Sequence, residues 1–144
     1  MSSPFAARNQ RATLYAKVGL ETDVQAASPH RLVAMLFDGV FDAMAQATQA
    51  IQTGNVELKG RALSRAVRIL DEGLRAGLDM SAGQLAMDLR ELYGYICMRL
   101  TQANLKSDLA AIDECQRLLA PVREAWGAIS QTPAAQGAQP ARAA

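Results

Sequence analysis

Apolar residues recur at steps of three and four along most of the chain, the spacing that gathers them on one face of an α-helix. Such stretches cover residues 28–53, 56–78, 81–105 and 107–130, and we predict a helix over each of them. The predicted connections are about two to four residues long, so consecutive helices should lie side by side in opposite directions. The pattern therefore predicts an all-α fold, an antiparallel up-down four-helix bundle.

Each predicted helix has one main apolar stripe, which should face the core of the bundle. The stripes consist of Leu32, Leu36, Val40, Ala43, Ala47 and Ile51; Leu63, Val67, Leu70, Leu74 and Leu78; Leu85, Leu89, Leu92, Tyr93, Ile96, Leu100 and Ala103; and Ile112, Cys115, Leu119, Val122, Trp126 and Ile129.

Serine residues mark three of the predicted helix starts. Ser28 precedes Pro29, so an N-cap is followed by the residue best suited to the first helical position. Ser81 is followed three residues later by Gln84, which predicts a capping box. Ser107 is the predicted N-cap of the last helix.

The third predicted helix has a second, partial apolar stripe, about half a circle from the first on the helical wheel. It consists of Met87, Gly94, Met98 and Leu105, with Tyr95 beside it, and charged residues interrupt it. Scattered apolar residues are normal on protein surfaces, so ordinary surface is one interpretation. The other is a helix that lies between its own core and a partner.

Small residues line one side of the second predicted helix, which indicates that another helix approaches it closely. That neighbour belongs either to the same bundle or to a partner. The small residues are Ala62, Ala66, Gly73 and Gly77, and Leu58 and Ile69 lie just outside them.

We divide the chain into an N-terminal arm (1–27), the bundle (28–130) and a C-terminal tail (131–144). The tail contains Ala, Gln, Pro and Gly but no large apolar residue, so we predict that it is disordered. The arm has apolar anchors at Leu14, Tyr15 and Val18. It is either a strip that seals the bundle or a removable cap that lies in a binding groove.

Charge and composition exclude several classes of protein. The chain has 144 residues, half of them apolar, and a formal net charge of +1, whereas general nucleic-acid binders are strongly basic. Most of its arginines stand within about one helical turn of a carboxylate, as in Glu57/Arg61 and Asp71/Arg75. No apolar run matches a secretory signal or a membrane span. We therefore expect a cytosolic protein with no nucleic-acid partner and no membrane insertion.

The sequence has no recognisable catalytic or metal-binding pattern. A Gly-rich phosphate loop, an HExxH motif and a nucleophile elbow are absent. His30, the single histidine, has no evident partner and should lie on the surface, and Asp38 and Asp42 should be solvated carboxylates. Cys97 and Cys115 should be buried free thiols, which suit a reducing compartment. We predict no enzyme activity, no metal and no cofactor.

Several segments, in this order and spacing, resemble the flagellin export chaperones of the FliS family. ASPHRLVAMLFDG is similar to the opening helix of that family, and LYAKV to its tyrosine-containing N-terminal element. KGRALSRAVRILDEGLRAGLD, ELYGYICMRLTQANL and REAWGAIS are similar to its second helix, its third helix and its end. The resemblance covers roughly residues 15–130.

The resemblance implies a chaperone whose client is flagellin. Such a chaperone holds the C-terminal helical segment of flagellin in a one-to-one complex, prevents premature polymerisation, and supports delivery to the flagellar type III export apparatus. The export gate and other flagellar regulators are further partners that it implies. As a hypothesis, the flagellin groove is lined by Leu58, Ala62, Ile69, Met87, Tyr95, Met98 and Leu105, and the cap is formed by Leu14, Tyr15 and Val18.

Two other functions remain open from the residues alone. In a self-associating structural or adaptor bundle, the second stripe of the third helix would be a homodimer face. An RNA-binding bundle fits less well, because the arginines alternate with carboxylates.

Overall fold

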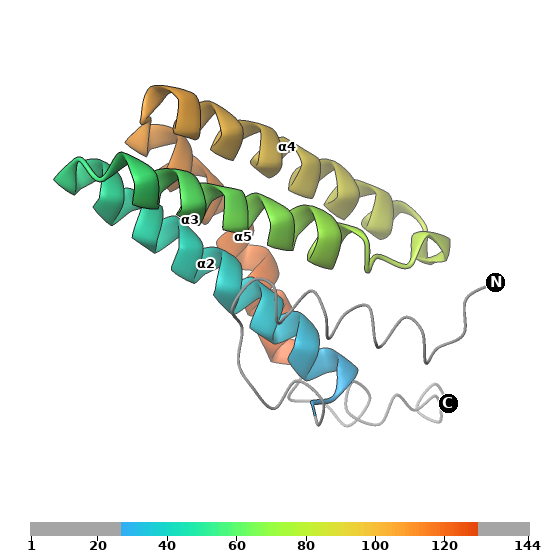
Figure 1. Cartoon of the computed structure of the whole chain (residues 1–144). Helices are drawn as coiled ribbons and strands as arrows, with labels where there is room; N and C mark the ends of the chain where they lie inside the picture. Colours follow the sequence, from blue (N-terminus) through green and yellow to red (C-terminus); the bar gives the residue numbers. More distant parts are fainter. Residues whose placement is uncertain (1–26, 130–144) are drawn as a thin grey trace, which may run out of the picture.

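The computed structural model describes residues 27–129, which form four packed helical segments (Figure 1). Helix α2 spans Pro29–Thr53, and α3 spans Val56–Arg68 and continues directly into the π-helix η2, Ile69–Arg75. A short 3-10 turn η3, Met80–Ala82, leads into α4, Gln84–Lys106, and α5 spans Leu109–Ile129. No strand occurs within 27–129, so the all-α prediction is confirmed. The predicted tail, and the predicted arm except for Ala27, lie outside the described residues.

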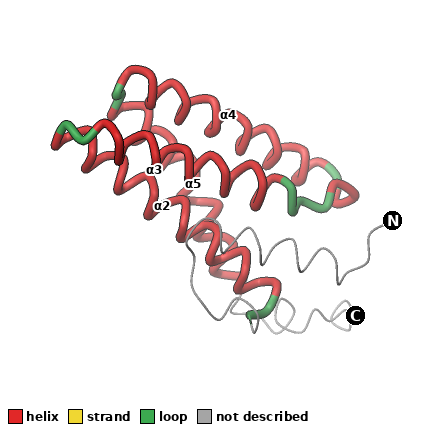
Figure 2. The backbone as a smooth tube through the Cα atoms, viewed as in Figure 1, coloured by secondary structure: helices red, strands yellow, loops and turns green. Residues whose placement is uncertain are grey.

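The helices close into a ring. Helix α2 packs against α3 and α5, and α4 packs against the same two neighbours. Consecutive helices run in opposite directions, and Figure 2 shows how short the connections between them are. One end of the bundle carries the α2–α3 and α4–α5 turns, and the other carries η3, the start of α2 and the end of α5. We call these the closed end and the open end.

The core runs along the inside of this ring. Burying an aliphatic or aromatic side chain of this kind stabilises the fold by about 1.5–3 kcal/mol. The largest fully buried side chains are Phe37, Val40, Met44, Leu63, Ile69, Leu70, Ile96, Leu100, Ile112, Cys115 and Leu119.

Two predicted core positions are exposed instead. Leu85 is 67% exposed and Ile129 is 46% exposed. Leu85 is the second residue of α4 and Ile129 the last of α5, so both lie at the open end, beyond the packed layers. Helical periodicity identifies a face but not the length over which a neighbour covers it.

The helix starts are only partly as predicted. The Ser28 Oγ accepts a hydrogen bond from the Arg31 N–H at 3.1 Å, which confirms that N-cap. The prediction of a capping box that begins with Ser81 is wrong. Its N–H donates to the Asp79 side chain, and α4 begins after Gly83 without a side-chain cap. An aspartate two residues upstream competes for the same donor through a local turn.

The predicted N-cap of α5 is also wrong, by one residue. The Asp108 Oδ1 accepts from the N–H groups of Ala110 (3.0 Å) and Ala111 (3.3 Å), so Asp108 is the cap. Ser107 instead ends α4 in the left-handed conformation, with φ of 50°, and its Oγ accepts a 2.9 Å hydrogen bond from Lys59 Nζ. That bond attaches the α4–α5 turn to α3.

The prediction of one regular helix over residues 56–78 is replaced by α3 followed by η2. The Ala76 N–H bonds to the Asp71 carbonyl, five residues back, as in a π-helix. Leu70 and Leu74 are both buried across this wider turn, so the predicted apolar stripe keeps facing the core.

Candidate functional site

Exposed large apolar side chains concentrate on one side of the bundle. Helix α2 contributes none within the described residues and α3 only Val56. Single exposed apolar residues are normal, but all the remaining ones lie on two adjacent helices and the turn before them, which indicates an interaction surface. The other members are Met80, Leu85, Met87, Tyr95, Met98, Leu105, Leu109, Leu118 and Ile129.

The predicted second stripe of α4 does face outward. Met87, Tyr95, Met98 and Leu105 are 51%, 38%, 46% and 80% exposed, and we call these four residues the outer face of α4. Between Met87 and Met98 the helix carries Gly94, where an added Cβ would meet nothing within 4 Å. The outer face therefore has a shallow, open place at its middle.

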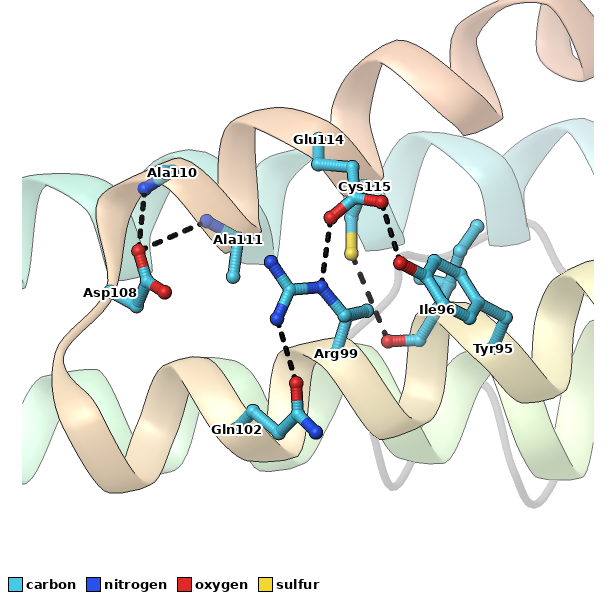
Figure 3. A network of polar contacts seen from close by, with 9 residues as sticks. All are labelled: Tyr95, Ile96, Arg99, Gln102, Asp108, Ala110, Ala111, Glu114 and Cys115. Carbon is cyan, nitrogen blue, oxygen red and sulfur yellow. Dashed lines mark hydrogen bonds and ion pairs between the residues drawn. The ribbon is translucent and has the colours of Figure 1, made fainter.

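Tyr95 is the only member of the outer face with a polar atom, and that atom is bound within the chain (Figure 3). The Tyr95 Oη donates to Glu114 Oε2 at 2.6 Å, and Arg99 Nε donates to Glu114 Oε1 at 2.8 Å. Arg99 Nη1 also donates to Gln102 at 2.7 Å. These hydrogen bonds from Tyr95 and Arg99 lower the pKa of the Glu114 carboxyl, while the bond to Glu114 raises the pKa of Tyr95.

An apolar hollow of about 120 Å³ lies at the open end, between α2, η2, α4 and α5, and we call it the open-end cleft. Tyr93 forms part of its wall, and burial raises the pKa of this tyrosine to about 12. A hollow of this size can take one large side chain. It is lined by Val33, Leu36, Phe37, Gly73, Leu74, Gly77, Leu78, Leu89, Tyr93, Val122 and Trp126.

His30 and Trp126 join the two helices on one side of this cleft. The His30 Nε2 lies 2.8 Å from the Trp126 carbonyl oxygen, Trp126 Nε1 donates to the His30 carbonyl at 3.1 Å, and the rings stack with centroids 4.6 Å apart. The prediction that His30 has no partner is therefore wrong. The two residues are 96 positions apart, so the contact could not be seen in the local pattern.

Arg123 makes a second connection between α5 and α2. Its Nη2 bonds to Asp38 at 2.6 Å, and its guanidinium lies 4.7 Å from the centroid of the Phe41 ring. The prediction that Asp38 is a solvated carboxylate is therefore wrong, because Asp38 is paired with Arg123. Asp42 is exposed.

A second hollow, of about 320 Å³, lies between α3, η2 and α4. Its lining combines apolar side chains with hydroxyl, amide and charged groups. The residues are Leu63, Ser64, Val67, Arg68, Asp71, Glu72, Leu100, Thr101 and Asn104.

Two predicted groove residues lie inside the bundle. Ala62 is 2% exposed and Ile69 is fully buried, so neither offers a surface to a partner. Helix α3 contacts both α2 and α4, and its buried arc is therefore wider than its stripe of large residues. Leu58 is half-buried at the edge of that arc. The predicted cap residues Leu14, Tyr15 and Val18 lie outside the described residues.

Sequence reasoning missed Leu118 and the cleft. Leu118 stands next to the buried Leu119 but outside the apolar stripe of α5. Only its large apolar side chain could have indicated an exposed contact. The pair Gly73 and Gly77 did indicate a close neighbour, but in the structure these glycines leave space and line the cleft.

Both cysteines are free thiols, as predicted. Cys115 is buried and Cys97 half-buried, and burial raises their pKa values to about 12 and about 11. In the described part of the chain, no group of three or more His, Cys, Asp or Glu side chains is arranged to hold a metal ion. No helix between residues 27 and 129 has the length and apolar character needed to cross a membrane.

Comparison with known proteins gives one consistent result. A family model described as flagellar protein FliS matches residues 11–133. A flagellar secretion chaperone FliS from Salmonella typhimurium is 49% identical over 117 residues, 81% of this chain and 87% of the relative. The FliS chaperone of Escherichia coli is 42% identical over 85% of this chain and 89% of its own, and that of Bacillus subtilis 32% over 74% and 78%.

Proposed function

Because the chain belongs to the FliS family of flagellar secretion chaperones, we propose that its client is flagellin, held by its C-terminal helical segment in a one-to-one complex. Members of this family act by binding and not by catalysis. The observation that carries the proposal is the collection of exposed apolar side chains on α4, α5 and the preceding turn.

The chaperone acts by covering client surface. An amphipathic segment that is unfolded or loosely helical can fold onto an apolar helix face, and the cost of ordering it keeps the complex releasable. The covered segment cannot pair with other flagellin molecules, so premature polymerisation is blocked. The complex forms in the cytosol and delivers its client to the flagellar type III export apparatus, where the export gate and other flagellar regulators are further partners.

The client site consists of the outer face of α4, with Leu58 as an additional contact on α3. Exposure of Met87, Tyr95, Met98 and Leu105 supports this assignment, and burial of Ala62 and Ile69 removes them from it. The open-end cleft supplies a pocket for one large apolar side chain of the client.

The N-terminal arm acts as a removable cap through Leu14, Tyr15 and Val18. The described chain begins at the open end, where Ala27 packs against the core, so the arm joins the bundle at the same end as the cleft. A cap that competes with the client reduces the competent fraction of the protein and therefore the apparent affinity. Deleting residues 1–24 should then tighten binding of a flagellin C-terminal peptide. Unchanged or weaker binding would contradict a purely competitive cap.

Co-expression with flagellin tests the proposed function directly. We expect a soluble complex that elutes with one copy of each chain in size-exclusion chromatography with light scattering. A stable homodimer that ignores flagellin would contradict the proposal and favour the alternative, a self-associating adaptor whose apolar surface pairs with a second copy.

A further inference from the structure

Successive turns of α4 hold the two oxygens of one carboxylate on α5. Tyr95 binds one oxygen of Glu114 and Arg99 binds the other, at 2.6 and 2.8 Å, and Gln102 holds Arg99 from the next turn (Figure 3). The side chains of Arg99 and Glu114 are only 23% and 33% exposed. The cluster is therefore partly shielded from water already, unlike the nearby pair of Arg117 and Asp113, whose side chains are 74% and 61% exposed.

The position of Tyr95 makes this arrangement relevant to binding. Its ring belongs to the outer face of α4, three residues before Met98. A partner that covers this face removes water from the phenol group, and a hydroxyl that loses water without gaining an acceptor weakens the complex. Glu114 supplies the acceptor from within the chain. Hydrogen bonding keeps the pKa of Glu114 below its usual range, so the carboxylate is ionised at neutral pH.

We propose that Glu114 is a positioning residue for client binding, which satisfies the Tyr95 hydroxyl and fixes its ring so that α4 presents an ordered aromatic surface. Glu114 acts through Tyr95 and Arg99 and need not touch the client. A tyrosine held by its hydroxyl has little side-chain freedom left to lose on binding. This inference rests on the proposed function, because it concerns the same surface.

A double-mutant cycle separates this role from a structural one. Glu114→Ala should weaken binding of a flagellin C-terminal peptide by about tenfold, because the covered hydroxyl is left without an acceptor. In a Tyr95→Phe background, the same Glu114→Ala change should cost less than about threefold, because no hydroxyl remains. Glu114→Gln keeps one acceptor oxygen and should therefore reduce the affinity less than Glu114→Ala does. In the Tyr95→Phe background, this smaller loss of affinity should shrink as well.

Calorimetry would measure the affinities, at a temperature where urea melts show every variant to be folded. Asp113→Ala, which breaks the exposed pair with Arg117, is the matched control and should bind like wild type. Equal losses from Glu114→Ala in both backgrounds would overturn the proposal, as would unchanged affinity of Glu114→Ala. A larger loss from Tyr95→Phe than from Glu114→Ala would overturn it too, because the hydroxyl would then bind the client directly. If wild type itself does not bind, the proposed function fails instead.

Discussion

Met98 and Ile96 stand on opposite sides of α4, and together they separate binding from folding. Met98 is 46% exposed, so Met98→Glu places a carboxylate in water and should change the free energy of unfolding by no more than about 0.5 kcal/mol. In the complex the same carboxylate loses water without an assured partner, and binding of the flagellin peptide should weaken at least about tenfold. Urea melts and calorimetry measure the two effects.

Ile96→Glu is the paired control. Ile96 is fully buried, and a carboxylate there should abolish the cooperative unfolding transition. If Met98→Glu binds like wild type, this part of α4 is ordinary surface and the client lies elsewhere, with the open-end cleft as the next site to examine.

One tyrosine and two cysteines whose pKa values are raised by burial predict how stability depends on pH. Burial raises the pKa of Tyr93 from 10.0 to about 12, of Cys97 from 9.0 to about 11, and of Cys115 from 9.0 to about 12. The folded state therefore favours their protonated forms, and the unfolded chain releases these protons first as pH rises. Their contribution to the free energy of unfolding is complete below about pH 9 and should be lost progressively between about pH 9 and 12.

Chemical denaturation at pH 7.5 and pH 10 would show this loss. Cys115→Ala should reduce the difference between the two pH values, although the variant is less stable at both because of the cavity it creates. The same thiols should react slowly with iodoacetamide in the folded protein and rapidly in urea. Fast labelling of Cys115 under native conditions would contradict its burial.

At the scale of the helices, the sequence predicted where the helices lie but not how each begins or where one becomes a π-helix. Four apolar stripes identified the helices correctly, because each is long and periodic. Their starts were less certain, because neighbouring side chains can act as alternative caps. Asp79 accepts from the N–H of Ser81, and Asp108 rather than Ser107 accepts from the N–H of Ala110. The π-helix was not predicted, because Leu70, Leu74 and Leu78 follow one another at the four-residue spacing of a regular helix.

Two helical glycines offer a comparison between cleft and surface. Gly73 lines the open-end cleft, whereas a Cβ at Gly60 in α3 would meet nothing within 4 Å. Gly60→Ala should raise the free energy of unfolding by about 0.5–1 kcal/mol and leave peptide affinity unchanged. Gly73→Ala takes up space in the cleft and should weaken binding without lowering stability. Equal affinity of the two variants would exclude the cleft from the client site.

At the scale of the whole molecule, the sequence predicted the order and direction of the helices but not how the ring closes. Short turns make each helix pack beside the next, and this information is local. The contacts between α2 and α5 join residues far apart in the sequence, and His30, Trp126, Asp38 and Arg123 form a recognisable set only in the folded bundle. The same limit hid the open-end cleft, whose walls come from four different segments.

Trp126 is the only tryptophan, and it lies in the cleft wall, so its fluorescence reports on the site. Binding of the flagellin peptide should shift its emission to shorter wavelengths, because a client side chain replaces water next to a half-buried indole. Binding that calorimetry detects without any change in emission would place the client away from the open end.

The long-range connection between His30 and Trp126 also sets a delay during synthesis. The ribosome adds about 5–20 residues per second, so the 96 positions between the two residues correspond to about 5–20 s. Over that interval α2 is complete, yet the side of it that α5 will cover remains bare. During synthesis, the chain therefore exposes an apolar surface that favours aggregation until α5 has been made and covers it.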